Sequence, residues 1–219
     1  MTFAEVESEW DRLELPPLEE LLSPPEQAEL SILKAETRRS TWLAGRKLLR
    51  LMLLEERKIA PGELTIQTRN DQRQGIRPLI HYQNQLLPGC FSLTHSDSRV
   101  AVDWSEEPGI SIGIDLITPA SISPTQFDWA LTDSEKTIIQ GGGDSTQLTS
   151  AIWALKEATY KAANQQGEGF NPQQVTLNQN AAGEWYAHYR GEDLSRCGQW
   201  SVQSIQDDLL ARVVLKLDS

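Results

Sequence analysis

The sequence has few cysteines, no long apolar run and no excess of basic residues. Its 219 residues include two cysteines, Cys90 and Cys197, which form no CxxC pair and favour neither a disulfide framework nor a zinc site. No stretch of about 18 apolar residues occurs, so we expect no membrane span. The first ten residues carry three glutamates and no basic residue, unlike the basic-then-apolar order of a signal peptide. These absences predict a cytoplasmic protein with free thiols.

The charge of the chain narrows the class of ligand. A formal net charge of −11 argues against general binding to nucleic acid, because such binding needs a basic surface facing the phosphates. Ten acidic residues fall between Met1 and Glu36, whereas eight of the twenty lysines and arginines fall between Lys34 and Lys58. A local basic stretch in an acidic protein indicates one anionic ligand rather than a polyanion.

Local patterns predict a long helical region followed by short strands in the first half. The segment 23–26, Ser-Pro-Pro-Glu, is typical of a helix start, and a helical pattern continues, with or without a break, to about residue 58. Strands are expected at 63–68, 78–82, 91–93 and 100–104. Isoleucines at 110, 112 and 114 alternate, so one face of that strand is buried and the strand ends at an aspartate.

The second half repeats this order of elements. Thr132 to Glu135 matches a capping box that opens a helix, the glycines at 141–143 predict a flexible loop, and a second helix is expected over 147–165. Strands are expected at 175–177, 185–189, 200–205 and 209–217. We therefore predict an α+β fold with two similar α/β lobes in a pseudo-twofold arrangement, residues 1–106 and 107–219. The pseudo-symmetry rests on element order, because no strong internal sequence repeat is visible.

One predicted helix carries side chains suited to chemistry. Trp153, Glu157 and Lys161 are four residues apart and share a helical face. A Glu–Lys pair at this spacing is commonly a surface ion pair worth about 0.2–0.5 kcal/mol. The functional alternative is a carboxylate that binds a metal or accepts a proton, with a lysine close by to stabilise negatively charged oxygen.

A second carboxylate, Asp115, ends the isoleucine-rich strand in the segment Gly113-Ile114-Asp115. A lone aspartate at such a place is commonly a turn or helix-cap residue. Together with Glu157 it would form a hard oxygen site suited to Mg²⁺. This ion usually takes one or two protein carboxylates, and phosphate oxygens and water fill its other positions.

A histidine and several arginines are candidates for binding an anion. His95 follows the predicted strand in Phe91 to Ser96 and could donate to a phosphate, or it could be a loop histidine bonded to backbone. Arginine suits phosphate through its forked donors, although basic runs are commonly solvated surfaces. The arginines that we single out are three on one helical face and one in a turn, namely Arg39, Arg46, Arg50 and Arg77. The chain has no GxSxG elbow and no P-loop.

The order and spacing of these motifs resemble the Sfp-type 4'-phosphopantetheinyl transferases. The family pattern contains Ala-Gly-Arg-x-Leu-Leu-Arg, Gly-Lys-Pro, Phe-Asn-x-Ser-His-Ser, Gly-Ile/Val-Asp and Trp-x-x-Lys-Glu-Ala/Ser-x-x-Lys. This chain is similar at 44–50, loosely at 76–78, at 91–96, at 113–115 and, at every fixed position, at 153–161. The resemblance covers about residues 34–170, and the chain from Asn171 onward adds no motif.

The resemblance implies an Mg²⁺-dependent enzyme. It would transfer the 4'-phosphopantetheine group of coenzyme A to a serine of an apo acyl or peptidyl carrier protein and release 3',5'-ADP. Asp115 and Glu157 would meet at the seam between the lobes and bind Mg²⁺, and Glu157 or a nearby water would take the serine proton. Lys161 would stabilise the departing pyrophosphate. The residues implied to contact coenzyme A are Arg39, Arg46, Arg77, Thr94, His95 and Lys161.

Three positions depart from the family pattern. Many bacterial members carry a third acidic ligand two residues after the aspartate, where this chain has Ile117, so a water or another side chain must fill that place. Arg77 replaces the usual lysine and keeps the charge. Thr94 replaces the usual serine and keeps the hydroxyl.

Two alternatives stay open, together with the choice of partner. The chain could be a non-catalytic coenzyme A-binding regulatory protein of the same fold, or an α+β interaction module whose motifs are coincidental. A two-lobed single chain favours a monomer with broad specificity, because shorter family members must pair to build one site. Fatty-acid, polyketide and peptide carriers all remain open. Because carriers are acidic like this chain, we expect docking through apolar contacts and a small basic patch between the lobes.

Overall fold

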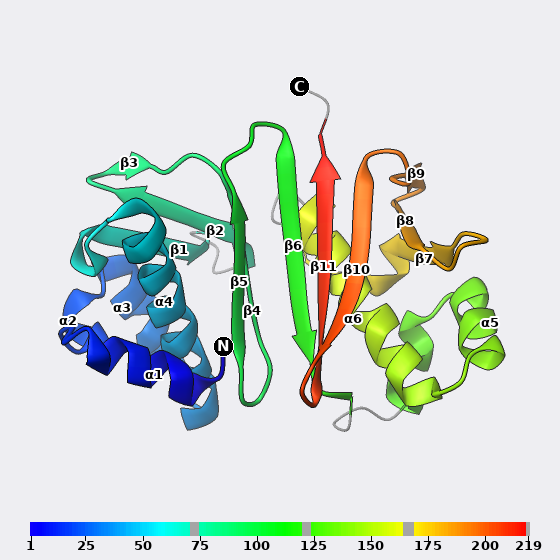
Figure 1. Ribbon diagram of the computed structural model, residues 1–219, viewed down its shortest axis with the longest axis horizontal. Helices are drawn as coiled ribbons and strands as arrows, with labels where there is room; N and C mark the ends of the chain where they lie inside the picture. The colour runs from blue at the N-terminus through cyan, green and yellow to red at the C-terminus, as the bar shows by residue number, and fades with distance from the viewer. Residues whose placement is uncertain (71–74, 120–123, 164–168, 218–219) are drawn as a thin grey trace.

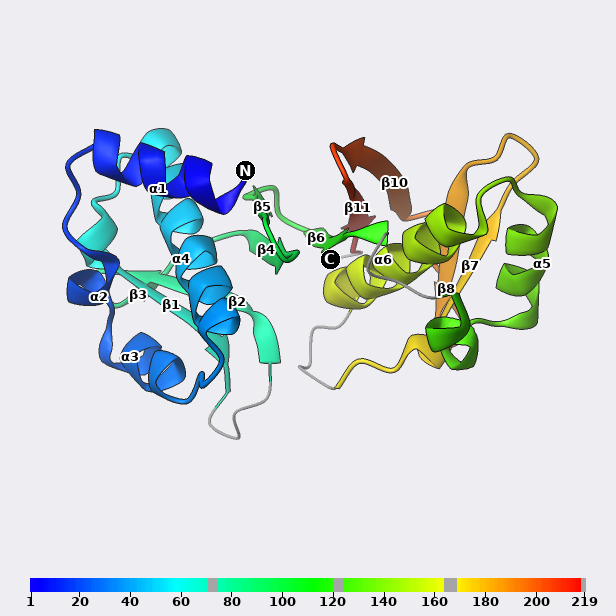
Figure 2. The same cartoon turned by 90° about the horizontal axis from the view of Figure 1, so that it is seen from below.

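The protein has an α+β fold in which two α/β halves flank a central group of strands (Figures 1 and 2). The computed structural model describes residues 1–70, 75–119, 124–163 and 169–217. No helix in this described part of the chain combines the length and apolarity needed to cross a membrane. The predicted fold class and the two α/β halves are confirmed.

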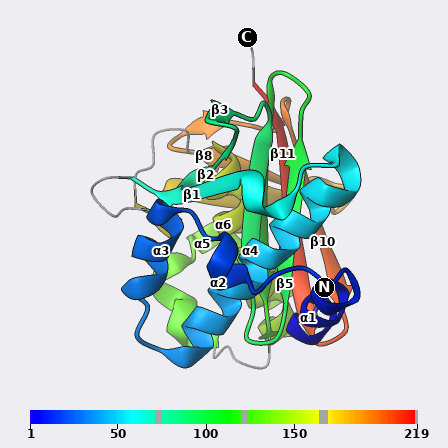
Figure 3. The ribbon, with the colours of Figure 1, turned by 90° about the vertical axis from the view of Figure 1, so that its left-hand side faces the viewer.

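The N-terminal half is a set of helices packed against short strands. Its helices are α1 (Phe3–Arg12), α2 (Leu18–Leu21), α3 (Pro24–Ser31) and α4 (Glu36–Arg57). A short 3-10 turn, η1 (Pro61–Glu63), leads into β1 (Leu64–Arg69), β2 (Gly75–Tyr82), β3 (Gln85–Leu86), β4 (Cys90–His95) and β5 (Val100–Ser105). When the N-terminal half faces the viewer, its helices lie in front and the central strands lie behind (Figure 3).

The C-terminal half begins with a central strand and continues with helices. The strand is β6 (Ile110–Ile117), followed by η3 (Pro124–Ala130), α5 (Asp133–Gly141), α6 (Ser145–Ala163) and η4 (Pro172–Gln174). The chain ends with β7 (Val175–Gln179), β8 (Trp185–Tyr189), β9 (Glu192–Asp193), β10 (Gly198–Ile205) and β11 (Asp208–Lys216). β11 pairs with both β10 and β6, so the last strand of the chain completes the sheet that β6 begins.

The two halves repeat one order of elements. In each, a long helix and a 3-10 turn precede a small antiparallel sheet, β1-β2-β3 or β7-β8-β9, and then a hairpin, β4-β5 or β10-β11. The predicted helix starts at 23–26 and 132–135 are confirmed as capping boxes of α3 and α5. Patterns in the sequence missed α1 and α2 and the two-residue strands β3 and β9. The end of the helix predicted to reach residue 165 lies outside the described residues.

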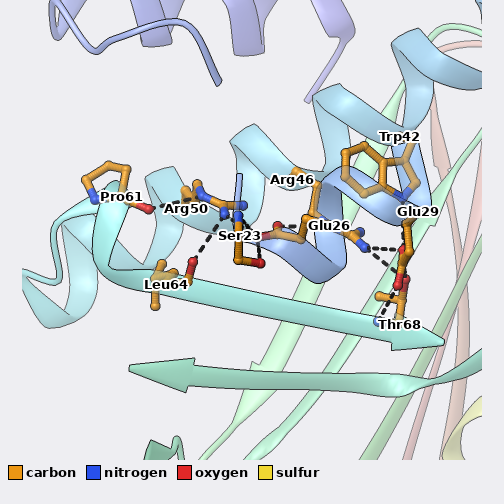
Figure 4. A network of polar contacts seen from close by, with 9 residues as sticks. All are labelled: Ser23, Glu26, Glu29, Trp42, Arg46, Arg50, Pro61, Leu64 and Thr68. Carbon is orange, nitrogen blue, oxygen red and sulfur yellow. Dashed lines mark hydrogen bonds and ion pairs between the residues drawn. The ribbon is translucent and has the colours of Figure 1, made fainter. Parts of the chain in front are cut away.

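A buried ion pair recurs at the same place in both halves. In the N-terminal half Arg50 of α4 contacts Glu26 at 2.9 Å and donates to the carbonyl oxygens of Pro61 at 3.1 Å and Leu64 at 3.4 Å (Figure 4). Glu26 also accepts the capping-box hydrogen bonds of Ser23. The long helix is thereby tied to the preceding helix and to the first strand of the sheet.

In the C-terminal half Lys156 of α6 takes the place of that arginine. It contacts Glu135 at 2.8 Å and donates to the carbonyl oxygens of Pro172 at 3.0 Å and Val175 at 2.8 Å. Glu135 occupies the third position of a capping box, as Glu26 does. Both ion pairs are fully buried, so the internal repeat is expressed in buried polar side chains rather than in overall sequence similarity.

The seam between the halves is formed by β4 and β6, which lie side by side without a backbone ladder between them. Instead, three small side chains on β4 accept hydrogen bonds from backbone N–H groups of β6. The pairs are Cys90 with Ile112 at 3.1 Å, Ser92 with Ile114 at 3.0 Å and Thr94 with Leu116 at 3.2 Å. These contacts satisfy N–H groups that would otherwise be buried without a partner. We call this set of three pairs the seam ladder.

Candidate active site

A cavity of about 330 Å³ lies between the N-terminal half and α6. Its size falls at the lower end of the range for small-molecule sites. Tyr160 and Lys161 line it from α6, and Trp42 and Phe91 belong to its apolar wall. The basic side chains that line it are Arg38, Arg46, Arg69, Arg77, His95 and Lys161. In a chain with a net charge of −11, this concentration of cations favours an anionic ligand.

Two carboxylates meet around one ammonium group beside this cavity. Lys161 Nζ lies 2.7 Å from Asp115 Oδ1 and 3.8 Å from Glu157 Oε2, and it donates to the carbonyl oxygen of Ile114 at 3.0 Å. Asp115 stands on β6 and Glu157 on α6, so both come from the C-terminal half. The N-terminal half contributes Thr94 of β4, whose hydroxyl contacts Asp115 at 3.0 Å.

A glycine allows the helix to approach the strand closely enough for this meeting. A Cβ added to Gly113 would lie 1.9 Å from the carbonyl oxygen of Ala158, far inside any tolerated contact. Without that side chain α6 packs directly on β6, and Glu157 and Lys161 flank Asp115. The glycine of the Gly-Ile-Asp segment therefore has a packing role, which brings the polar groups together.

The electrostatics of the pair follow from this crowding. Burial raises the pKa of Glu157 to about 7, and the negative charge of Asp115 adds to the effect, whereas Lys161 and a hydrogen bond from Trp153 act against it. Burial by itself would lower the pKa of Lys161, but the two carboxylates outweigh it and raise that pKa. The site therefore holds a charged lysine next to a carboxyl group poised near neutral pH.

The donor set suits a hard divalent cation. Asp115 and Glu157 provide carboxylate oxygens around a point where a positive charge is already stabilised, and Mg²⁺ requires no more than one or two such ligands from a protein. Among the residues that the structure describes, no group of three or more His, Cys, Asp or Glu side chains gathers. The position of the usual third ligand, Ile117, packs against the apolar core of the C-terminal half.

His95 and Thr94 are neighbours on β4 that differ in exposure: His95 lines the cavity, whereas Thr94 is buried. His95 lines the cavity at the end of β4, and although it is exposed, the protein around it and the charge of Lys161 lower the pKa of its ring. Thr94 is buried, with 5% of its surface exposed, and both its contacts go to β6. The implied role of His95 in binding phosphate stays a prediction.

The arginines predicted to contact coenzyme A have three different environments, and their role in binding also stays a prediction. Arg46 is 2% exposed, with its Nη2 3.0 Å from Glu29 and 2.8 Å from Thr68, and its guanidinium stacks on the Trp42 ring at 4.2 Å (Figure 4). Burial lowers the pKa of Arg46 to about 10, although Glu29 acts against it. Arg39 donates to the carbonyl oxygen of Leu30 at 3.1 Å.

Sequence reasoning passed over Arg38, which lines the cavity. Positions 38, 42 and 46 are four residues apart and share the face of α4 that meets the cavity, so helical spacing counted from Trp42 would have found it. Arg69 of β1 also lines the cavity, and no local signal marks it. From α4, the arginines that line the cavity are thus Arg38 and Arg46.

Arg77 links the two halves at the edge of the cavity. From β2 of the N-terminal half it donates to Ser111 at 2.8 Å and to the carbonyl oxygens of Lys161 at 2.8 Å and Ala162 at 2.9 Å. These carbonyl groups belong to the last turn of α6, where a cation is favourable. Arg77 therefore holds the end of the helix that carries Glu157 and Lys161.

Fold and site together define an α+β protein with a cationic cavity beside a paired-carboxylate centre. Residues 111–214 match the family model of the 4'-phosphopantetheinyl transferase superfamily. The chain therefore contains a domain of this superfamily. The matched region includes Asp115, Glu157 and Lys161, and it reaches into β11, beyond the part of the chain where motifs were visible. The narrower Sfp-type assignment stays a prediction.

Several solved structures are similar to about half of the chain. A holo-[acyl-carrier-protein] synthase from Thermotoga maritima is 21% identical to this chain, with a TM-score of 0.43. The similarity covers 49% of this chain and 64% of the Thermotoga protein. A coenzyme A complex from Chronobacterium ammoniagenes is 18% identical with a TM-score of 0.43, over 50% of this chain and 98% of its own. A holo-(acyl-carrier-protein) synthase from Bacillus anthracis is 23% identical, with a TM-score of 0.41, over 49% of this chain and 96% of its own. Similarities this weak do not extend the family assignment.

The curated proteins provide no match to this chain.

Proposed function

We propose that this protein transfers the 4'-phosphopantetheine group of coenzyme A to a serine of an apo carrier protein. The observation that carries the proposal is the meeting of Asp115, Glu157 and Lys161 at the edge of a cation-lined cavity. A cavity lined by basic side chains, suited to a multiply charged phosphate ligand, thus lies beside a carboxylate able to take a proton. The superfamily domain over 111–214 supports the same reaction class.

In the proposed reaction the oxygen of the carrier serine forms a bond to the phosphorus that bears the pantetheine arm. The bond from that phosphorus to the bridging pyrophosphate oxygen breaks, and 3',5'-ADP leaves. The serine proton passes to Glu157, or to a water held beside it, because this carboxyl group has a pKa near neutral. The step needs no oxidant or reductant, and positioning and charge neutralisation supply most of the rate.

Lys161 has the geometry to stabilise the leaving group. Its ammonium has three N–H donors, of which one points to Asp115 and one to the carbonyl oxygen of Ile114. The third is left for Glu157 or for a phosphate oxygen of a bound ligand. Mg²⁺, when bound by Asp115 and Glu157, would neutralise charge on the pyrophosphate.

The experiment that tests the proposal is a carrier-loading assay. Purified protein is incubated with coenzyme A, Mg²⁺ and several apo carriers, and each carrier is weighed by intact-mass spectrometry. We expect at least one carrier to gain one phosphopantetheine group. Asp115→Ala and Glu157→Ala should abolish the gain, whereas the exposed glutamate variant Glu20→Gln should match the wild type.

Other outcomes would favour the alternatives. No mass gain on any carrier, with coenzyme A still bound in calorimetry, would favour the non-catalytic coenzyme A-binding protein, for which the apolar residue Ile117 is the supporting observation. Ligand binding that is unchanged in both Asp115→Ala and Glu157→Ala would favour a plain interaction module.

A further inference from the structure

Building on the proposed function, we propose that Thr94 is a positioning residue for the carboxylate of Asp115, rather than a ligand of a coenzyme A phosphate. The proposal concerns which atom the threonine hydroxyl serves. It follows from the contacts of that hydroxyl, from the comparison with its neighbour on β4, and from the contacts of the two oxygens of Asp115.

The single O–H donor of Thr94 is already engaged inside the protein. A hydroxyl has one O–H donor and two acceptor positions. Thr94 Oγ1 accepts from the backbone N–H of Leu116 at 3.2 Å and donates to Asp115 Oδ1 at 3.0 Å, since a carboxylate can only accept. With its one proton directed to Asp115, the hydroxyl has no donor left for a phosphate oxygen.

Burial supports the same reading. Thr94 is 5% exposed and Asp115 is 7% exposed, so the contact between them is shielded from water. A phosphate, which needs donors that face the cavity, would have to displace this hydrogen bond. His95, the next residue, is exposed and lines the cavity, so it can reach a ligand without breaking a buried contact.

The contact with Asp115 distinguishes Thr94 from its neighbour in the seam ladder. Ser92, two residues earlier on the same strand, accepts from the N–H of Ile114 at 3.0 Å in the same way, but the residue beside that contact is not a carboxylate. Satisfying β6 N–H groups is therefore the common task of the ladder. Orienting a carboxylate is an additional task, which Thr94 performs.

Thr94 and Lys161 together determine which oxygen of Asp115 is available. The hydroxyl at 3.0 Å and the ammonium at 2.7 Å both bind Oδ1. Within the described part of the chain, no hydrogen bond or ion pair engages Oδ2. The two contacts thus hold the carboxylate plane and present Oδ2 as the oxygen for a cation. Residues that orient a metal ligand in this manner typically change metal affinity about 10–100-fold when removed.

The test compares three variants by metal binding in the absence of turnover. Thr94→Val keeps the shape and removes the hydroxyl, Thr94→Ser keeps the hydroxyl, and Ser92→Ala removes the equivalent hydroxyl elsewhere in the ladder. Binding of Mn²⁺, a paramagnetic substitute for Mg²⁺, is titrated by electron paramagnetic resonance, with and without saturating coenzyme A. Affinity for coenzyme A is measured separately by calorimetry in EDTA, and thermal unfolding shows that each variant is folded.

We expect Thr94→Val to weaken Mn²⁺ binding about 10–100-fold, with the affinity for coenzyme A in EDTA unchanged. Thr94→Ser should restore the metal affinity. Ser92→Ala should lose thermal stability, as Thr94→Val does, yet bind Mn²⁺ as the wild type does. This difference separates a positioning role from a merely structural one.

Three results would overturn the proposal. Thr94→Val could weaken coenzyme A binding in EDTA while Mn²⁺ binding stays normal, which would make the hydroxyl a phosphate ligand. Ser92→Ala could weaken Mn²⁺ binding as much as Thr94→Val, which would assign the effect to the ladder as a whole. Wild-type protein that binds no Mn²⁺ under either condition would also end it. Transfer itself is decided by the mass of the carrier, so failure of the proposed function is recognised independently.

Discussion

At the scale of single residues, one buried carboxylate joins three segments next to the site. Asp208, at the start of β11, is 2% exposed and accepts from Ser96 at 3.0 Å, from Arg99 at 2.6 Å and from Thr118. Ser96 directly follows His95 on the β4 side, and Thr118 follows the end of β6. The contacts of Asp208 therefore fix the ends of the two strands that carry His95 and Asp115.

The ionisation of Asp208 makes its contribution to stability dependent on pH. Burial would raise its pKa, but the hydrogen bonds from Thr118, Arg99 and Ser96 outweigh burial and lower the pKa below its ordinary value. A carboxyl group with a lowered pKa in the folded state stabilises the fold above its ordinary pKa of about 3.9. That stabilisation is lost as the pH falls through the lowered pKa.

We therefore predict that Asp208→Asn lowers the free energy of unfolding by about 3–5 kcal/mol near neutral pH, because Arg99 loses its buried partner. The difference from the wild type should shrink as the pH falls below the ordinary pKa of aspartate. Urea unfolding of both proteins across this pH range measures the difference. A gap that stays constant down to the lowest pH at which both remain folded would contradict the assigned role of the charge.

At the scale of elements, the repeated ion pair explains how each long helix is held. Lys156 is the fixed lysine of the Trp-x-x-Lys-Glu segment, and it points away from the site into the core, where it contacts Glu135 and three carbonyl oxygens. In the other half, Arg50 contacts Glu26 and two carbonyl oxygens. The two ion pairs thereby anchor α4 and α6, the two helices that contribute Trp42, Arg46, Tyr160 and Lys161 to the cavity wall.

We predict that Lys156→Met and Glu135→Gln each destabilise the protein by about 3–5 kcal/mol, because either change leaves a buried charge without its partner. The double variant should lose less than the sum of the two, since no unpaired charge remains. Chemical denaturation in a double-mutant cycle measures this coupling. Lys136→Met is the matched control, because that lysine on α5 is partly exposed to solvent and its ion pair contributes at most about 1 kcal/mol. Strictly additive losses would contradict a direct interaction.

At the scale of the whole molecule, the two ligands of the proposed reaction meet parts of the protein that differ in charge. The chain has a net charge of −11, yet its cavity is lined by basic side chains. A small anion therefore meets a local field opposite in sign to the field of the protein as a whole. An acidic carrier protein contacts a much larger surface and experiences the overall charge.

We predict opposite effects of salt on the two binding steps. Binding of an apo carrier should stay flat or strengthen as salt rises, because screening removes repulsion between two acidic proteins. Binding of coenzyme A should weaken with salt, because the cavity attracts it electrostatically. Fluorescence anisotropy of a labelled carrier and calorimetry of coenzyme A, over the same salt series, measure both. A steep loss of carrier binding with salt would contradict docking through apolar contacts.

The sequence alone was sufficient for features encoded within a few turns of chain. Prolines in the first turn located the start of α3, and a capping box located the start of α5. The alternating isoleucines located β6, and the spacing of Glu157 and Lys161 placed both on one helical face. Each of these patterns depends on neighbours that are local in sequence, so reading the chain in order reveals them. The helix α1 was missed although Thr2 and Glu5 form a capping box at its start.

Only the tertiary structure decided which polar groups are engaged and which are left for a ligand. Arg46 is neutralised by Glu29 from another helix, Thr94 is bound by a neighbouring strand, and the last strand of the chain completes the sheet of Asp115. The motifs could not show this, because the partners of a buried charge or hydroxyl come from segments far away in sequence. Burial, which determines how strongly those partners interact, exists only once the chain has folded.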